Sequence, residues 1–576
     1  MNLDLRPFGS YEEALAGFTL ELPDFFNVAE VLGYHASPDR PALHCAGGRA
    51  RLETMTFAAL EEASARVGSA FRRLGVRRGS RVALALASTP EAAIVEFGAM
   101  RVGALAASMR PGVRDEAWRH QLTLVQPEVV VCEPGAVEEF RALVPTGCRI
   151  VSADRGEWAA WWTAGAVAGT GTTVSLAELM ASGAVDEPIE RTAAADPAYI
   201  TFTSGSMGAM KAAVLSHASF LAGVPAFQMF TNFAPAPGDV FFPSLGWAIS
   251  AGLRTLTFPA WYFGFPVVGA DQRLADGRAV AELLTGLRVS VALLMPQILR
   301  ELRQLGDDVL EYDWTALRVI AYSGEAISSD LRDWLESKLG VVLHPYYGAT
   351  EISYVASTCR AWFPSASGEV GRRVPGRELA ILAEDSLLPV EPGAAGVLAV
   401  RRSDPGLSLG YLHPGEEEPR FDASSTTDQF FLTGDLGTIG VDGNLRYLGR
   451  SGQSIRSSAG EAIPPMDVED AVLSVTAVRE AAALQSQDDP PGEVCACVSL
   501  VDPGTDETAV AHEIGLAVHS RFQENIRVSR VVVLDELPKT AATAKINRRL
   551  AAEILRTGSP APLAMIALAG TTSEPV

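Results

Sequence analysis

The sequence contains few cysteines, and their spacing suggests no structural role. Its 576 residues include six cysteines scattered along the chain. Two of them form a Cys-x-Cys pair without partner histidines, so neither a zinc site nor a disulfide framework is indicated. This usage fits a reducing compartment, and we expect the protein to be cytoplasmic. The cysteines are Cys45, Cys132, Cys148, Cys359, Cys495 and Cys497.

An excess of positive charge is also missing. Lysine and arginine total 47 against 69 aspartates and glutamates, which gives a formal net charge of −22 at pH 7. So acidic a chain is a poor general surface for nucleic acid or anionic lipid, and any phosphate site must be local. We expect no nucleic-acid partner.

Long apolar runs and repeats of fixed period are absent from the sequence. The N-terminal region carries Asp4, Glu12 and Glu13 before any apolar stretch, which is unlike a signal peptide. The apolar stretch after residue 92 is interrupted by Glu96 and Arg101. We therefore expect no membrane span.

What the chain does contain is an alternation of helix-like and strand-like segments. Its composition, 48% hydrophobic and 20% charged, supplies ample core for several subdomains. Apolar residues at helical spacing predict a helix over 60–74 and another over 90–102. Compact β-branched runs predict strands over 81–87 and 126–131. This alternation is typical of an α/β layer.

The stretch Thr203–Lys211 combines hydroxyls, two glycines and a lysine directly after an apolar run. Gly205 and Gly208 permit backbone angles that let several N–H groups point at one anion, and Lys211 adds a mobile charge. An ordinary surface turn has the same composition. A Walker loop fits poorly, because two residues separate the last glycine from the lysine. The other candidate phosphate ligands are Thr203, Ser204 and Ser206.

Later glycine turns also follow apolar runs. One is Ser323-Gly324-Glu325-Ala326, and a second is the YYGATE segment from Tyr346 to Glu351. A tyrosine before a glycine can lay its ring against a flat base, and a glutamate is a hard-oxygen ligand suited to Mg²⁺. Further on, Asp435 in LTGDLG can accept from both hydroxyls of a ribose, or it can merely cap a turn.

Two further features have open interpretations. Trp247, in an aromatic-rich segment with Gly252, either shapes a pocket for an apolar acid or belongs to the core. Near the end of the chain, Lys545 and Lys539 both lie in a small-residue loop before a helix-like segment. Position alone does not choose between these lysines.

Taken in order, these motifs resemble the core motifs of the adenylate-forming superfamily. That superfamily includes acyl-CoA synthetases, peptide-synthetase adenylation domains and luciferases, and the style here is closest to acyl-CoA synthetases. The resemblance spans about residues 52–550, nearly the whole chain. Its motifs are the segment 199–214, the Ser323 turn, YYGATE, LTGDLG, the Gly449-Arg450 pair and the late lysine.

The resemblance implies an α/β multidomain fold. Residues 1–449 would form a large N-terminal domain of helix-covered sheets with a small β-barrel-like part. Residues 450–556 would form a small mobile α+β cap that carries the catalytic lysine. Residues 557–576 are rich in Pro, Ala, Ser and Thr without periodicity, and we expect a disordered tail there.

The resemblance also assigns roles to individual residues. The loop 203–211 would hold the β and γ phosphates, and Lys545 would reach the carboxylate and the α-phosphate. Thr350 and Glu351 would meet phosphate and Mg²⁺. Residues flanking adenine would be Gly324, Glu325, Ala326, Tyr346, Tyr347 and Gly348; those holding the ribose, Asp435 and Arg450; those lining the acyl pocket, Trp247, Gly252 and Ser323.

The implied function is ATP-dependent activation of a carboxylic acid, bulky and apolar, to an acyl-AMP with release of pyrophosphate. The acyl group would then pass to a pantetheine thiol of CoA or of an acyl-carrier protein. ATP and Mg²⁺ are the implied cofactors, and CoA or phosphopantetheine the implied co-substrate. The oligomeric state is open, a dimer included.

Departures from the family pattern keep alternatives open. Met207 replaces a usual threonine, Gly452 replaces the usual hinge aspartate, and the loop 457–463 is one residue longer than usual. An adenylase that stops at acyl-AMP and passes it to a separate thioester-forming enzyme is therefore one alternative. A non-catalytic nucleotide-binding relative and a luciferase-type oxygenase are two others.

Overall fold

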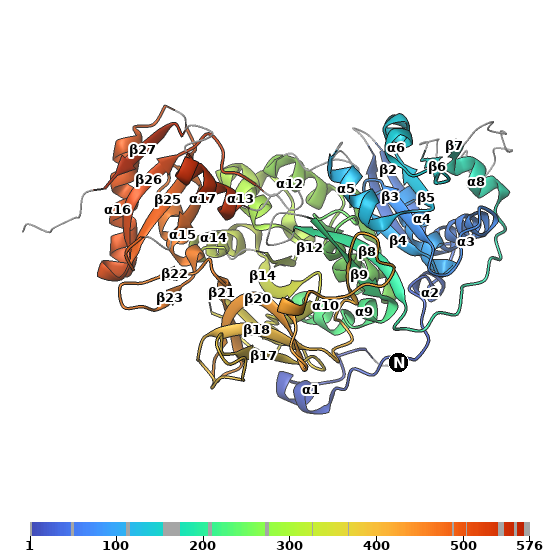
Figure 1. Ribbon diagram of the computed structural model, residues 1–576, viewed down its shortest axis with the longest axis horizontal. Helices are drawn as coiled ribbons and strands as arrows, with labels where there is room; N and C mark the ends of the chain where they lie inside the picture. The colour runs from blue at the N-terminus through green and yellow to red at the C-terminus, as the bar shows by residue number, and fades with distance from the viewer. Residues whose placement is uncertain are drawn as a thin grey trace, which may run out of the picture.

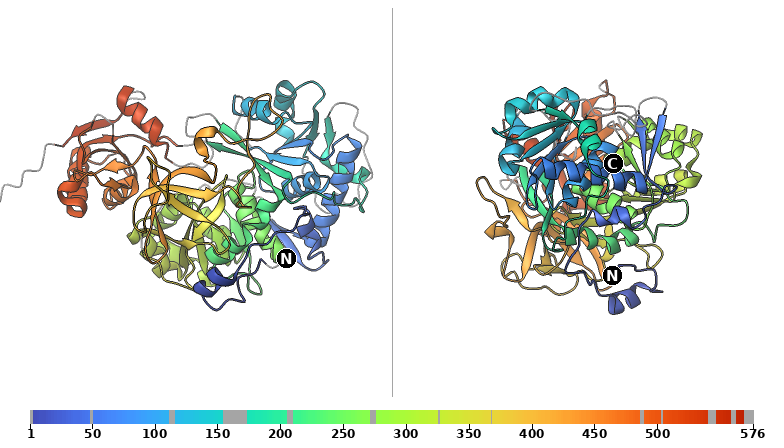
Figure 2. Two further views of the ribbon diagram at one scale, coloured as in Figure 1. Left: turned by 60° about the horizontal axis from the view of Figure 1, so that its bottom comes forward. Right: turned by 90° about the vertical axis from the view of Figure 1, so that its right-hand side faces the viewer.

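The computed structural model describes residues 3–47, 51–110, 116–153, 173–204, 210–270, 276–324, 327–366, 368–485, 489–502, 504–539, 546–557 and 562–568. Figure 1 shows the C-terminal elements, coloured orange to red, gathered at one end of the molecule and the blue N-terminal elements at the other. The left view of Figure 2 shows the same separation. The fold is thus a large body with a smaller C-terminal unit beside it.

The first large sheet has eight strands in the order β19-β9-β8-β4-β3-β5-β6-β7. Its strands pair in parallel from β8 to β7, whereas β8 and β9 form an antiparallel pair and β19 adds antiparallel to β9. The strands are β3 (Arg81–Ala85), β4 (Leu105–Ser108), β5 (Val129–Cys132), β6 (Arg149–Ser152), β7 (Thr173–Ser175), β8 (Pro197–Ser204), β9 (Met210–Ser216) and β19 (Gly410–Leu412).

Alternate residues of these strands enter two different core layers. On β3, Val82 and Leu84 join the central core, whereas Ala83 and Ala85 face an outer layer. A parallel sheet buried on both faces explains why its strands read as continuous apolar runs. The strand predicted over 81–87 is confirmed. The outer helices are α5 (Glu116–Val125) and α6 (Val137–Leu143).

The second sheet has thirteen strands in the order β17-β18-β20-β21-β16-β15-β14-β13-β12-β10-β11-β1-β2. In its first part, β1 and β10–β14 pair in parallel with their neighbours. The edge strand β2 pairs antiparallel with β1. The strands of this part are β1 (Pro41–Gly47), β2 (Arg51–Thr56), β10 (Phe241–Pro243), β11 (Val267–Ala270), β12 (Val291–Leu293), β13 (Val319–Tyr322) and β14 (Val342–Ala349).

A helical layer fills the space between the two sheets and carries most of the core. The predicted helices over 60–74 and 90–102 are confirmed as members of this layer. It comprises α2 (Glu30–Gly33), α3 (Phe57–Arg73), α4 (Pro90–Arg101), α8 (Leu176–Ser182), α9 (His217–Leu221), α10 (Val224–Phe230), the π-helical segment η3 (Ala251–Thr257) and α11 (Phe258–Tyr262). The far face of the second sheet is covered by α12 (Gly277–Gly286), α13 (Pro296–Gln304) and α14 (Ser329–Leu339).

The predicted β-barrel-like part corresponds to the antiparallel half of the second sheet. Its strands follow β14 in the sheet. In the part of the chain that the structure describes, they form an open sheet rather than a closed barrel. A short helix, α1 (Tyr11–Gly17), lies below these strands in Figure 1. The strands are β15 (Ser353–Ser357), β16 (Glu369–Arg373), β17 (Leu379–Leu382), β18 (Gly396–Arg401), β20 (Phe430–Ile439) and β21 (Asn444–Arg450).

The C-terminal unit has its own four-stranded sheet, β24-β25-β26-β27, and its own apolar core. Since β21 ends at Arg450 and this core begins at Ile455, we retain the boundary after Gly449 as a proposal. The elements are β22 (Ile455–Arg456), β23 (Ala462–Ile463), α15 (Pro465–Leu473), β24 (Val478–Leu484), β25 (Glu493–Leu500), α16 (Glu507–Phe522), β26 (Arg527–Val533), α17 (Arg548–Thr557) and β27 (Ala564–Ala567).

Two sequence expectations need correction. The tail predicted to be disordered from residue 557 contains β27, which pairs antiparallel with β26 and completes the C-terminal sheet. A run of four apolar residues is too short to predict a strand from the sequence alone. The strand forms because β26 offers it a partner. The YYGATE segment is not wholly a turn, because Tyr346–Ala349 belong to β14 and only the residues after Ala349 turn.

Candidate nucleotide and acyl site

The predicted phosphate loop connects β8 and β9, which form a hairpin. Thr203 pairs with Lys211 across this ladder, and the backbone of Ser204 pairs with Met210. Gly205, Ser206 and Gly208 lie outside the described residues. The hairpin places the hydroxyl of Thr203 and the ammonium of Lys211 at one end of the first sheet.

Lys211 is held by a carboxylate and an aromatic ring. Its Nζ lies 2.5 Å from Oδ2 of Asp422 and 4.6 Å from the ring centroid of Tyr411. The hydrogen bond from Lys211 lowers the pKa of Asp422. Tyr411 reaches this position because β19 adds to β9, with Tyr411 paired to Ala213.

The same tyrosine connects Lys211 to the predicted magnesium ligand. The hydroxyl of Tyr411 donates to Oε1 of Glu351 at 2.7 Å. Burial, followed by the negative charges of Glu351 and Asp422, raises the pKa of this hydroxyl. The structure therefore joins Lys211 and Glu351, which the sequence proposed for phosphate and Mg²⁺, through one shared side chain.

Sequence reasoning missed both Tyr411 and Asp422. A signal was present in the Gly410-Tyr411 pair. Gly410 has φ +117°, and a Cβ on it would lie 2.4 Å from the backbone of Arg420. Only glycine fits there, so its presence marks the close approach of two chain segments that positions Tyr411.

Thr350 lies where the chain leaves β14. Its Oγ1 is 3.2 Å from Oγ of Ser250, and its carbonyl oxygen accepts from Nη2 of Arg254 at 3.0 Å. These contacts connect the turn before Glu351 with the helical layer. The hydroxyl of Thr350 thus lies beside that of Ser250.

The predicted ribose ligands form a second cluster, on β20 and β21. Asp435 and Arg450 are paired across this ladder, with Arg450 Nε 3.1 Å from Asp435 Oδ1. Tyr347 donates its hydroxyl to Oδ2 of Asp435 at 2.7 Å, and Tyr447 lies 3.5 Å from Oδ1. Burial opposes the charge of Arg450, but the nearby Asp435 carboxylate raises the pKa of Arg450 overall.

Of the remaining adenine candidates, Tyr346 and Gly348 lie on β14. Tyr346 is buried and stacks on Phe230 with ring centroids 4.8 Å apart. A Cβ at Gly348 would lie 2.1 Å from the carbonyl oxygen of Ser353, so close strand packing alone requires this glycine. Gly324 follows β13 with φ +94°, next to Ser323. Glu325 and Ala326 lie outside the described residues.

The acyl-pocket candidates Trp247 and Gly252 are deeply buried. Trp247 is 1% exposed, and its ring packs edge-on against Trp261 at 6.1 Å. Tyr199 donates its hydroxyl to the carbonyl oxygen of Trp247 at 2.6 Å. A Cβ on Gly252 would lie 2.2 Å from the carbonyl oxygen of Leu245. Core packing accounts for both residues, and their pocket role stays a prediction.

The predicted hinge and the two late lysines belong to the C-terminal end of the chain. Gly452 has φ +79° in the turn between β21 and β22, and apart from its chain neighbours no described residue has an atom within 4 Å of a Cβ built there. Lys539 pairs with Glu480 at 2.8 Å within the C-terminal unit. Lys545 lies outside the described residues, so its role stays a prediction.

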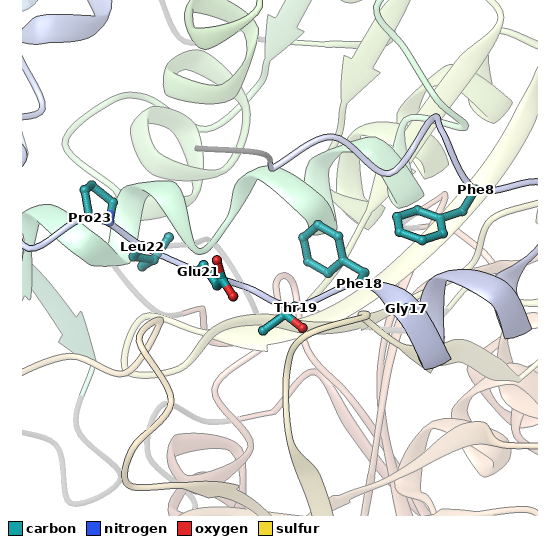
Figure 3. A pocket seen from close by; sticks show the side chains of 7 residues that line it. All are labelled: Phe8, Gly17, Phe18, Thr19, Glu21, Leu22 and Pro23. Atoms are coloured by element: carbon teal, nitrogen blue, oxygen red, sulfur yellow. The ribbon is translucent and has the colours of Figure 1, made fainter.

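A cavity of about 540 Å³ lies elsewhere, along the N-terminal segment between Phe8 and Pro23. Figure 3 shows the side chains that line it, including Phe18 and Leu22. None of the predicted site residues that the structure describes lines this cavity. Among the described residues, no group of three or more His, Cys, Asp and Glu side chains is arranged to hold a metal ion. Within the same part of the chain, no helix is long and apolar enough to span a bilayer.

Two family models match most of the chain. A family model described as AMP-binding enzyme matches residues 34–412, and one described as AMP-binding enzyme C-terminal domain matches residues 467–543. Acyl-coenzyme A synthetase ACSM5, mitochondrial, of Mus musculus is 26% identical, over 93% of this chain and 92% of the relative. 4-coumarate--CoA ligase 3 of Oryza sativa subsp. japonica is 26% identical, over 87% and 88%.

Solved structures share the fold. The anthranilate CoA ligase AuaEII in complex with anthranoyl-AMP has a TM-score of 0.80 at 22% identity and covers 93% of this chain and 99% of that one. ATP-bound MatB from Rhodopseudomonas palustris has a TM-score of 0.76 at 20% identity, with 92% and 99% covered. The predicted fold class, a large α/β domain followed by a small α+β domain, is confirmed.

Proposed function

Because the chain belongs to the family of AMP-binding enzymes, we propose that it activates a carboxylic acid with ATP and transfers the acyl group to the thiol of CoA. The predicted membership of the adenylate-forming superfamily is confirmed, and with it an enzyme of the acid–thiol ligase type. ATP and CoA are substrates typical of such enzymes, and Mg²⁺ accompanies the ATP.

One observation carries the proposal. Strand β14 and the turn after it connect the two clusters, since Tyr347 contacts Asp435 in the ribose cluster and Glu351 contacts Tyr411 beside Lys211. A single rigid strand therefore spaces a ribose-type site from a phosphate-type site. Such spacing suits one nucleotide lying along β14, with its base toward Tyr347 and its phosphates toward Lys211.

The chemistry follows from this placement. In the first half-reaction a carboxylate oxygen of the acid bonds to the α-phosphorus of ATP while the bond to pyrophosphate breaks. The nucleophile is already ionised at neutral pH, so no general base is required. Bringing anions together gains most from fixed positive charge and orientation, which Lys211 and Thr350 supply in this proposal.

In the second half-reaction the sulfur of the thiol bonds to the acyl carbon, and AMP leaves. We propose that Lys545 acts at the first step and that the C-terminal unit turns about Gly452 before the second. Glu351 is the proposed ligand of the Mg²⁺ that arrives with ATP. A bulky apolar acid, a carrier-protein thiol, a dimer and a cytoplasmic location stay predictions; the relative ACSM5 is named as mitochondrial.

A second candidate function has support at the hinge. Gly452 stands where the family usually has an aspartate, and it adopts a left-handed backbone with open space around it. An enzyme that stops at acyl-AMP would retain the nucleotide clusters and lose the side-chain contacts of the usual hinge aspartate. Those contacts matter only after adenylation, so the first half-reaction would be unaffected.

The test is an assay of the full chain with MgATP and a panel of carboxylic acids, with and without CoA. Acid-dependent pyrophosphate release and stoichiometric acyl-CoA are expected. Pyrophosphate release with retained acyl-AMP and no acyl-CoA would favour the adenylase. Absence of acid-dependent release would favour a non-catalytic relative, and oxygen uptake or light would favour an oxygenase.

A matched pair of variants connects the assay to the site. Asp435→Asn removes the charge that faces Arg450 and Tyr347, so KM for ATP should rise by about tenfold or more. Asp442→Asn alters an exposed carboxylate in the hairpin of the same two strands and should leave KM unchanged. Equal KM values in both variants would contradict the ribose assignment.

A further inference from the structure

Two fully buried arginines contact the chain around β15, and they differ in how their donors are satisfied. Arg377 is 1% exposed, and its guanidinium binds Asp404 with a closest approach of 2.7 Å. It also donates to the carbonyl oxygens of Tyr354 and Ile352 at 3.0 and 2.7 Å. Every nitrogen of Arg377 therefore has a partner, as a buried charge requires.

Arg254 is equally buried, at 1% exposure, but most of its donors are unused. Within the described part of the chain only Nη2 has partners, the carbonyl oxygens of Thr350 at 3.0 Å and of Ala349 at 3.5 Å. Its Nε and Nη1 have no hydrogen-bond partner, and no carboxylate forms an ion pair with it among the described residues. Such an arrangement is costly unless something else meets these donors.

The electrostatic surroundings of Arg254 do not compensate. Its charged neighbours are Arg377, which repels it, and Glu351, whose carboxylate already accepts from Tyr411. Burial lowers the pKa of Arg254 to about 10, so it remains a cation at neutral pH. The other groups that interact with it electrostatically are Tyr199 and Tyr354.

The position of Arg254 points to the acyl side of the site. It lies in the middle of η3, a seven-residue π-helical segment, and such segments occur frequently at functional sites. The indole Nε1–H of Trp247, a few residues earlier, is also buried without a partner in the described part of the chain. The unsatisfied Nε and Nη1 of Arg254, whose Nη2 contacts Thr350, indicate a missing acceptor rather than an isolated defect.

We infer that Arg254 binds a second acceptor group of the acid substrate, a carboxylate or an equally strong anionic group that takes no part in the reaction. This inference rests on the proposed function and specifies its substrate class. The acid would then be bulky but not wholly apolar, in contrast to the expectation from the sequence. Nη1, or Nε on the opposite edge of the guanidinium, would donate a charge-assisted hydrogen bond to this group.

The reacting carboxylate is a less suitable partner. Its charge is consumed when it bonds to phosphorus, so an ion pair with Arg254 would stabilise the bound acid more than the transition state. A second group keeps its charge throughout. Its interaction with Arg254 would therefore fix the orientation of the acid without slowing the reaction.

The experiment compares straight-chain dicarboxylates from malonate to sebacate, and the benzenedicarboxylates, with the monocarboxylates that lack the second group. At least one diacid should exceed its matched monoacid by about tenfold or more in kcat/KM for pyrophosphate release. Arg254→Met keeps the side-chain bulk without donors and should abolish that preference. Arg254→Lys keeps the charge and should retain part of it.

The control is Arg332→Gln, which alters a buried arginine on α14 that is 7% exposed and forms a longer ion pair, 3.5 Å, with Glu336. It should change thermal stability and leave acid selectivity unchanged. Equal loss for diacids and monoacids in Arg254→Met would show contact with the reacting carboxylate and overturn the inference. So would wild-type preference for every monoacid, or an effect of Arg254→Met on melting temperature alone.

Binding of the same acids without ATP, measured by calorimetry, separates this inference from the proposed function. If no acid releases pyrophosphate, the proposed function fails. Tighter binding of a diacid to wild type than to Arg254→Met would still support the role of Arg254. Identical binding of both acid classes to both proteins would refute it.

Discussion

Lys211 and Asp422 form an ion pair of 2.5 Å in the phosphate-type cluster, although 211 positions separate them in the sequence. The Asp422 carboxylate lies where an anion would meet the ammonium of Lys211. In the proposed site, a phosphate of ATP would share or replace this partner.

We predict that Asp422→Asn lowers KM for ATP by about two- to fivefold with little change in kcat. Both side chains are about one-third exposed, so a pair of this kind contributes roughly 1 kcal/mol or less. Steady-state kinetics at varied ATP measures the effect. Glu416→Gln, which removes an acidic charge nearby that pairs with Arg420, serves as the control. A higher KM in Asp422→Asn would show that the carboxylate supports ATP binding instead.

Replacing Lys545 by alanine should reduce acyl-AMP formation by about a hundredfold or more while ATP still binds. The lost charge would act mainly in the transition state. Lys539→Ala is the matched variant, because Lys539 already pairs with Glu480 within the C-terminal unit. Single-turnover measurement of acyl-AMP compares them. Greater damage from Lys539→Ala would reverse the assignment.

The hinge proposal predicts that Gly452→Ala slows acyl-CoA formation several-fold and leaves acyl-AMP formation within about twofold of wild type. Alanine restricts the backbone angles that glycine explores and disfavours φ +79° by about 1 kcal/mol. Gly443→Ala imposes similar strain, at φ +82°, in the hairpin between β20 and β21. Rapid-quench assays of both half-reactions decide; a parallel loss in the two variants would indicate strain alone.

Glu96 should make the protein less stable as the pH rises. Its side chain is buried, with Ser108 donating to Oε1 at 2.5 Å, and burial raises the pKa of Glu96 to about 8. Between about 4.5, the ordinary value, and about 8, the folded protein binds more protons than the unfolded chain. The free energy of unfolding therefore falls over that window, by on the order of a few kcal/mol.

Glu96→Gln should remove most of this dependence, so its melting temperature should exceed that of wild type at pH 8 and approach it at pH 5. Thermal melts at several pH values provide the measurement. Glu116→Gln, at an exposed position on α5, reports the general effect of removing one negative charge. Parallel pH profiles for wild type and Glu96→Gln would contradict the prediction.

Local pattern was enough to locate the nucleotide motifs on their elements. The hydroxyl and glycine loop after residue 199 does follow a strand, Tyr347 lies on β14, and Asp435 faces Arg450 across a hairpin whose bend contains Gly443. These relations follow from strand periodicity and turn chemistry, which act over a few residues. The sequence predicts a turn already at Tyr346, whereas the strand continues to Ala349 because β15 pairs with it.

Contacts across long sequence separations were beyond such reasoning. Nothing near Lys211 indicates Asp422 as its partner, since the pair depends on β19 returning to the edge of the first sheet. The burial of Trp247 depends on the helical layer between two sheets. The strand β27 exists only because the edge of β26 is available to it.

The sequence by itself determined the family and the order of its motifs, because those rest on short segments whose chemistry is local. Only the tertiary structure decided which charges are paired. Arg377 and Arg254 cannot be distinguished in the sequence. Yet Asp404 and two backbone carbonyls satisfy every nitrogen of Arg377, whereas Nε and Nη1 of Arg254 have no partner among the described residues. The difference arises because hydrogen bonding and desolvation depend on neighbours in space, which packing of distant segments supplies.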